Sequence, residues 1–174
     1  GPSTPATPDI SFNGNVGTAL LTPLGAITIA NGYDVTFGGN VSAASITQDT
    51  GTNSTTFTGN VATTGAILIT DGYDITFSGT VNAASITQTN GANSTTFAGD
   101  VTTNGAAGID ITATNIALDG LTMTAGTNPA ADIALTGAVT LSTTTVGLTA
   151  QNAITVTGTV DGGVPFSATS TNDA

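Results

Sequence analysis

A short motif, T-F-x-G-x-V, recurs along this chain at a constant spacing, with copies that begin at Thr36, Thr56, Thr76 and Thr96. A degenerate copy precedes them at Phe12, and later ones include Leu135 and Val156. A constant period of about 20 residues is typical of stacked structural units, each of which buries its apolar side chains only against its neighbours. The repeat therefore predicts a solenoid.

A longer period, twice the shorter one, lies over it. Residues 27–66 match residues 67–106 at most positions. The pair Tyr33-Asp34 recurs as Tyr73-Asp74, and the run A-A-S-I-T-Q at 43–48 recurs at 83–88. One long repeat thus contains two units of the shorter period.

Within each unit, apolar or small residues alternate with polar ones, as in the run from Asp34 to Ala43. A period of two is typical of a strand with one buried face. A unit of this length holds two or three short strands, and successive units stack about 4.8 Å apart in a sheet. We therefore expect an all-β fold, a parallel β-helix (β-solenoid) of about 20-residue coils. The alternative is an antiparallel β-sandwich built from hairpins.

The repeat also predicts the limits of the fold. We expect an extended N-terminal tail over 1–9, a single repetitive β domain over 10–166, and a C-terminal tail or strand over 167–174. About eight coils, at about 4.8 Å each, would make a short rod. An insertion or irregular corner is expected near 127–129, where the motif is lost.

In a parallel β-helix, equivalent residues of successive coils lie directly above one another. The motif therefore predicts two interior ladders, one of phenylalanine and one of valine: Phe37, Phe57, Phe77, Phe97, Val41, Val61, Val81 and Val101. The glycine between them marks a bend where a side chain does not fit.

The residue types that are missing exclude several functions. The chain has no Lys, Arg, His or Cys, and its formal net charge is -11. Without cations there is no electrostatic contact for nucleic acid or for an anionic membrane surface. No apolar run is long enough to span a bilayer, so we expect no membrane insertion. The nucleophile–His and Ser–Lys arrangements of hydrolases are impossible, and we expect no enzyme, no catalytic residue and no cofactor.

Aspartate is the only acidic residue type in the chain. Asp34 and Asp74 are two coils apart in this register, about 10 Å, which is near the separation of an inverting glycosidase pair. Repetition explains the spacing more simply. Calcium is the one metal to consider, through Asp34, Asp71, Asp74 and Asn31 at the corners. We favour Asx turns at these positions, and corner packing for Tyr33 and Tyr73 rather than a ligand platform.

The outward threonines suggest a further hypothesis. Thr36, Thr56, Thr76 and Thr96 would form one rank on a flat face, an arrangement that ice-binding solenoids use. Threonine is also the ordinary outward residue of a β-helix, so the rank by itself predicts little.

The recurrence of T-F-x-G-N-V with A-I-x-I-x-x-G-Y-D resembles the repeats of large bacterial surface proteins. The similarity is to the β-helices of filamentous-haemagglutinin-like proteins and autotransporter passengers, mainly over residues 26–106. It implies a secreted or cell-surface protein. The lack of Lys and Arg, which leaves trypsin-like proteases no site, agrees with an extracellular location.

A β-helix has two open ends with unpaired strands, and no capping segment is recognisable here. We therefore expect subunits to join end to end or to exchange terminal strands, which yields a filament. The expected function is a structural subunit of an extracellular filament, sheath or surface layer, with the chain itself as partner. The alternatives are a stalk module of a large adhesin and an ice- or glycan-binding solenoid that contacts surface glycans. The expected assembly residues lie near the two ends: Pro2, Pro5, Pro8, Ile10, Phe12, Val164 and Phe166.

Overall fold

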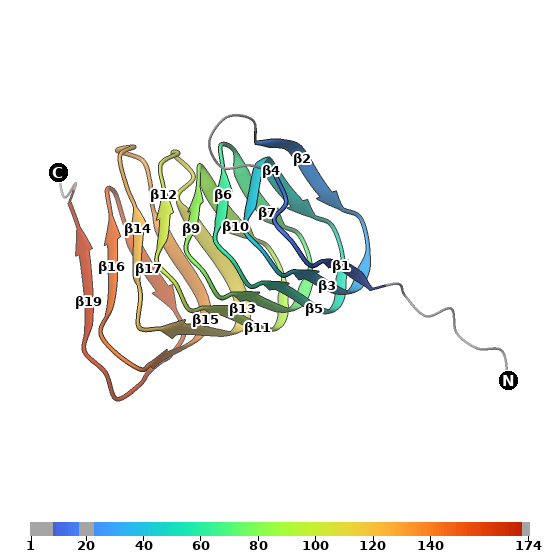
Figure 1. Ribbon diagram of the computed structural model, residues 1–174. Coiled ribbons are helices and arrows are strands. Elements are labelled where there is room, and N and C mark those ends of the chain that lie inside the picture. The colour runs from blue at the N-terminus through green and yellow to red at the C-terminus, as the bar shows by residue number, and fades with distance from the viewer. Residues whose placement is uncertain (1–8, 18–22, 172–174) are drawn as a thin grey trace, which may run out of the picture.

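The computed structural model describes residues 9–17 and 23–171, and this part of the chain forms a β-solenoid of about seven coils (Figure 1). Every strand pairing is parallel, so the parallel β-helix prediction is confirmed and the antiparallel sandwich is excluded. The strands form one continuous hydrogen-bonded sheet wound into a coil. Among the described residues there is no helix long and apolar enough to cross a membrane.

The coil has three faces, named here A, B and C. Face A, with which the described chain begins, contains β1 (Ile10–Phe12), β3 (Gly32–Phe37), β5 (Gly51–Phe57), β8 (Gly72–Phe77), β11 (Gly91–Phe97), the second halves of β13 (Ile109–Asp119) and β15 (Ile133–Ser142), and β18 (Val160–Asp161).

Face B follows face A in each coil. It contains the first half of β4 (Val41–Gln48), then β6 (Val61–Thr63), β9 (Val81–Ala83), β12 (Val101–Thr103), β14 (Thr122–Ala125), β16 (Val146–Ala150) and β19 (Phe166–Ser170). Val16 lies in the layer below β4 on this face and pairs with Val41 by an isolated bridge.

Face C completes the coil. It contains β2 (Leu24–Ile29), the second half of β4, β7 (Ala66–Ile69), β10 (Ser85–Gln88), the first halves of β13 and β15, and β17 (Ile154–Thr157). The strand region thus continues past Phe166 to Ser170. The irregular corner expected near 127–129 lies in the loop between β14 and β15.

The phenylalanines form a continuous stack inside face A. Rings of Phe12, Phe37, Phe57, Phe77 and Phe97 lie nearly parallel, with centroids 4.8 to 5.1 Å apart. The four inner rings are buried, and the valine rank on face B is buried beside them. This spacing is that of neighbouring strands, so each coil adds one ring to the stack.

The motif glycines occupy a corner with no room for a side chain. A Cβ added at Gly59 would lie 2.6 Å from the backbone of Gly39 in the preceding coil, and Gly79 and Gly99 are equally close to their neighbours. The residue after each of two motif glycines links neighbouring coils. Asn40, which follows Gly39, accepts a hydrogen bond at Oδ1 from Asn60 N. Asn60 Oδ1 accepts one from Thr80 N in the same way.

The longer of the two sequence periods has its origin in the interior. One type of coil has apolar residues at three inward positions, for example Ile29, Val35 and Ala43. The next coil has Gln48, Thr55 and Thr63 at the same positions, all buried. The alternation then repeats, with polar residues again at Gln88, Thr95 and Thr103.

A hydrogen bond inside the coil makes these polar residues compatible with burial. Thr55 Oγ1 donates to Gln48 Oε1 at 2.8 Å, and Thr95 Oγ1 donates to Gln88 Oε1 at the same distance. Each glutamine thus satisfies its carbonyl oxygen within its own coil. From β13 onward the interior is apolar, and the regular period ends at the same place.

Candidate binding and assembly surfaces

The C-terminal end of the solenoid exposes side chains that belong to inward ranks. Val160 lies in the rank of Val35 and Val139 on face A, yet 43% of its surface is exposed. Phe166 pairs with the buried Val146 on face B and is 40% exposed. Their outer side is open only because no further coil of described residues covers them (Figure 1).

The N-terminal end shows the same feature. Phe12 is 43% exposed, although the ring it stacks on, Phe37, is fully buried. Of the residues predicted to take part in assembly, Phe12 and Phe166 are exposed at opposite ends, and Ile10 and Val164 are half-buried. Pro2, Pro5 and Pro8 lie outside the described residues.

The aspartates considered for calcium fall into two places. Asp34 and Asp74 share one rank on face A, two coils apart, with Ser54 between them. Asp71 lies at the preceding corner, where its Oδ1 accepts a hydrogen bond from Asn90 Nδ2 at 3.2 Å. No three acidic, His or Cys side chains of the described residues cluster in a way that could hold a metal ion.

The Asp34 carboxylate is tightly engaged by the next coil. Its Oδ1 accepts hydrogen bonds from Ser54 Oγ at 2.5 Å, Asn53 Nδ2 at 2.8 Å and Ser54 N at 3.2 Å. These bonds, the Ser54 hydroxyl first among them, hold the pKa of Asp34 below its ordinary value despite some desolvation. Asp74 Oδ1 accepts from Asn93 Nδ2 and Ser94 N. Both carboxylates therefore hold adjacent coils together.

No family model, curated protein or solved structure matches this chain. The resemblance to bacterial surface-protein repeats therefore remains a prediction, as do the extracellular location and the absence of catalytic activity.

The outward threonines form the rank that the motif predicts. Thr36, Thr56, Thr76 and Thr96 are in register on face A, all half-buried. The neighbouring rank of that face is mixed, because Asp34, Ser54 and Asp74 occupy it. The face therefore presents one row of threonine beside one row of acidic and hydroxyl groups.

A second threonine rank was missed by the sequence analysis. Thr102, Thr124, Thr149 and Thr169 are in register on face B. Their sequence spacings are unequal, because the loops beyond β12 are longer than those in the regular repeat. No constant period could have revealed them, although each lies in an alternating segment.

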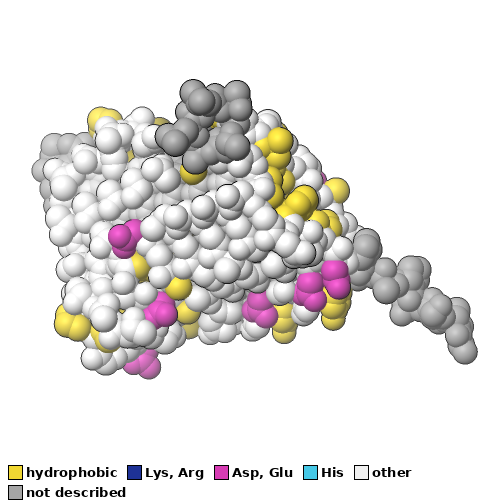
Figure 2. Space-filling model, viewed as in Figure 1, with side chains coloured by type: hydrophobic (Ala, Val, Ile, Leu, Met, Phe, Trp, Pro, Cys, Tyr) yellow, Lys and Arg dark blue, Asp and Glu magenta, His cyan; other side chains and the backbone are white. Residues whose placement is uncertain are grey.

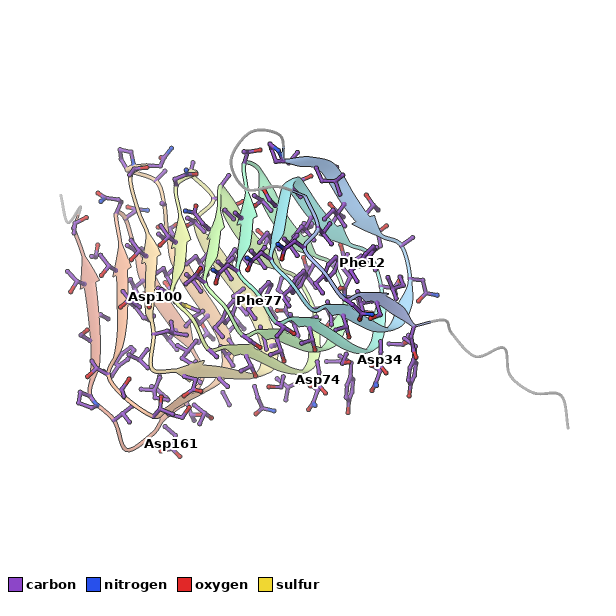
Figure 3. All side chains as sticks on the ribbon, in the orientation of Figure 1. Phe12, Asp34, Asp74, Phe77, Asp100 and Asp161 are labelled. Atoms are coloured by element: carbon purple, nitrogen blue, oxygen red, sulfur yellow. The ribbon has the colours of Figure 1, made fainter. Side chains whose placement is uncertain are left out.

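The two tyrosines lie at the corner between faces C and A. Tyr33 and Tyr73 are 43% and 45% exposed, so each side chain is partly covered at the corner and partly open to solvent. In Figure 2, hydrophobic and acidic side chains alternate along the lower edge of the molecule, where Asp34 and Asp74 lie in Figure 3. Leu24 and Leu68 are the other large apolar side chains exposed on face C.

A hollow of about 450 Å³ lies over the N-terminal part of face B. Its lining includes Asn15, Asn40 and Asn60 from the corner and Ser42 and Ala62 from the strands. The undescribed residues 18–22 follow directly after Gly17 in its wall, so we assign no ligand to it.

Proposed function

We propose that this chain is a structural subunit of an extracellular filament, sheath or surface layer, in which solenoids stack end to end. The observation that carries the proposal is the exposure of inward-rank side chains at the last coil. Val160 belongs to a rank whose members are buried in every coil that lies between two others, and Val146, the partner of Phe166, is buried in the same way. A second copy is an occupant of matching shape, because its first layer continues the same ranks.

The two ends have the geometry for such a contact. Ile10 belongs to the rank that ends at Val160, and Val16 belongs to the rank that ends at Ala168. Stacking β1 of one copy on β18 of another therefore continues face A in register. The strand edges of both would gain hydrogen-bonded neighbours. Because the contact joins unlike ends, it does not close, and it produces a filament.

The path of the coil leaves one strand position open at this junction. β1 and Val16 form a layer on faces A and B beneath β2, the first strand on face C. Stacked copies would therefore have room for one strand on face C, between β17 and β2. The assembly role predicted for Pro2, Pro5 and Pro8 is tested by deleting residues 1–8.

Charge sets the conditions for assembly. All charged side chains are aspartates, with none of opposite sign to compensate them. Stacked subunits repel one another through a net charge of -11 each, and added salt screens this repulsion. We therefore expect longer filaments at 0.5 M salt than at low ionic strength, where apolar contacts must overcome the full repulsion.

The test is assembly of the purified chain over a micromolar concentration series, followed by negative-stain electron microscopy and sedimentation velocity. Filaments of uniform width are expected. The double variant Val160→Asp/Phe166→Asp should remain monomeric. The matched control is Leu68→Asp, which adds the same type of charge at an exposed apolar residue on the side of the solenoid. Deleting residues 1–8 should weaken assembly without unfolding the coils.

Two outcomes would contradict this proposal. Short rods that persist at every concentration and salt level would indicate a monomer, and a stalk module within a longer adhesin would then explain the open ends. Filaments that form equally well from Val160→Asp/Phe166→Asp would show that the contact does not involve the last coil.

A further inference from the structure

The only two tyrosines of the chain occupy equivalent places in two coils. Each directly precedes an aspartate of the same rank, Tyr33 before Asp34 and Tyr73 before Asp74. Both rings are close to half exposed, although large aromatic side chains are otherwise buried or located at the two ends. An exposed, rigid aromatic ring with a polar hydroxyl is suited to contact with a partly apolar ligand.

The distance between the tyrosines follows from the coil rise. Two successive steps of the phenylalanine stack measure 4.8 and 4.9 Å, so equivalent residues two coils apart lie about 10 Å apart. The coil between them has Thr52 and Asn53 opposite Tyr33, where the strand pairing shifts by one residue. The two rings are therefore separated by a stretch without aromatic side chains.

We propose that the edge formed by Tyr33, Asp34, Tyr73 and Asp74, named here the tyrosine edge, binds a β-1,4-linked glucosamine polymer, such as partly deacetylated chitin. In an extended β-1,4-linked chain, sugar rings alternate in orientation, and every second ring presents the same face. The distance between such rings, one disaccharide, matches the separation of Tyr33 and Tyr73. Each tyrosine would contact the C–H face of one sugar ring, and the sugar between them would lie over Thr52 and Asn53.

Charge distinguishes this polymer from other polysaccharides. With no Lys, Arg or His, the chain has nothing to neutralise the carboxylates or sulfates of an anionic glycan. The ammonium group at C2 of glucosamine is complementary to Asp34 and Asp74, which directly follow the two tyrosines in the chain. Both carboxylates lie along the lower edge of the molecule in Figure 3. The Oδ1 atom of each carboxylate is held by the neighbouring coil, so the group is fixed in place before a ligand arrives.

This inference is independent of the end contacts. The tyrosine edge lies along the side of the solenoid, so it stays exposed whether or not subunits stack. A monomer that binds the polymer would contradict the assembly proposal alone, and a filament that does not bind it would contradict the binding proposal alone.

The experiment is isothermal titration calorimetry with the glucosamine hexamer, at 0.15 M salt, using the N-acetylglucosamine hexamer and cellohexaose as comparison ligands. We expect saturable binding of the glucosamine hexamer. Tyr33→Ala and Tyr73→Ala should each lower the affinity at least tenfold. The control Leu68→Ala, which removes an exposed apolar side chain outside the edge, should leave it unchanged.

Relocating a ring tests the spacing itself. Thr52 is exposed in the coil next to Tyr33, and the variant Thr52→Tyr/Tyr73→Ala keeps two tyrosines but places them one coil apart. It should bind as weakly as Tyr73→Ala. The proposal is overturned if no saturable binding occurs, or if the tyrosine variants bind normally, which would indicate charge attraction alone. Retained affinity in the relocated variant, or equal affinity for cellohexaose, would overturn it as well.

Discussion

The two polar coils offer an internal test of how burial and hydrogen bonding balance in this solenoid. They have the same inward residues, Gln-Thr-Thr, but they differ in what lies above them. Gln48 Nε2 donates to the main-chain oxygen of Asp71 at 3.1 Å in the next coil. Gln88 Nε2 is equally buried and has no hydrogen-bond partner among the described residues. Gln88 pairs with Ile111 of the strand above it, β13, and the regular repeat ends at this strand.

The third inward polar residue also has a hydrogen bond in the first polar coil and none in the second. Thr63 Oγ1 donates to the main-chain oxygen of Gly65 at 2.8 Å. The corresponding hydroxyl, on Thr103, has no partner among the described residues. The corner after Thr103 is longer, and the oxygen of Gly105 accepts from Gly108 N instead. The second polar coil thus has two unsatisfied polar atoms that the first coil does not have.

The perturbation is to replace each Gln–Thr pair with the Ile and Val found in the apolar coil, where Ile29 and Val35 occupy these positions. Replacing both partners of a buried hydrogen bond by apolar groups is close to neutral, whereas an unsatisfied buried group costs about 1–3 kcal/mol. Gln48→Ile/Thr55→Val removes both partners of that bond but also the donor to the main-chain oxygen of Asp71, so it should cost about 1 kcal/mol or less. Gln88→Ile/Thr95→Val removes an unsatisfied Nε2 and should be more stable than the first variant by about 1–3 kcal/mol.

The single variant Thr55→Val completes the comparison. It leaves Gln48 Oε1 buried without its donor, so a loss of about 1–3 kcal/mol is expected. The assay is equilibrium unfolding in guanidinium chloride, followed by circular dichroism, with the midpoint and slope compared among variants. The reasoning is refuted if Gln88→Ile/Thr95→Val is no more stable than Gln48→Ile/Thr55→Val. It is also refuted if Thr55→Val is as stable as the wild type.

Three further predictions concern the ladder, the corner and pH. Phe57→Ala should lower the free energy of unfolding by about 3–5 kcal/mol, because it interrupts a buried stack, while Leu68→Ala at an exposed site should change it little in the same denaturant assay. Gly59→Ala should reduce the thermal midpoint because its Cβ would lie 2.6 Å from backbone, whereas Gly25→Ala should not, because no atom of the described residues lies within 4 Å of a Cβ added there. Since the pKa of Asp34 is lowered on folding, its stabilising contribution is present above the unfolded pKa and is lost as pH falls through the folded value. Ser54→Ala should raise that pKa in a carboxylate NMR titration, and an unchanged value would contradict the assignment of the hydroxyl as its main cause.

The sequence predicted the fold because its strongest signal was also structural. Phe37 and Val41 recur at a constant spacing only if each coil returns to the same place, so the motif revealed both the coil length and the inward positions. The division of each coil into three faces could not be predicted from the motif. Corners such as the single residue Ala44 carry no glycine or proline signal, and β4 passes through that corner as one strand.

The interior polar pairs and the exposed tyrosines were harder to predict for a physical reason. Gln48 and Thr55 look like surface residues by type, and only the hydrogen bond between them makes burial acceptable. Tyr33 lies at a corner, where the two-residue alternation breaks down and exposure no longer follows from position in the sequence. The exposed ends were anticipated from the lack of a cap, and the structure locates the exposure at Phe12, Val160 and Phe166.

The alternation of polar and apolar coils limits how a solenoid of this kind can change length. On face C, the interval from Ile27 to Ile46 is shorter than the interval from Ile46 to Ile67, so adjacent coils differ in corner length as well as in interior. Losing the apolar coil between them would place Gln48 directly beneath Gln88 and join corners of unlike length. Losing or duplicating two coils preserves every rank. Gene duplication could therefore lengthen this rod two coils at a time without any accompanying point mutation, and single-coil steps would have to be repaired.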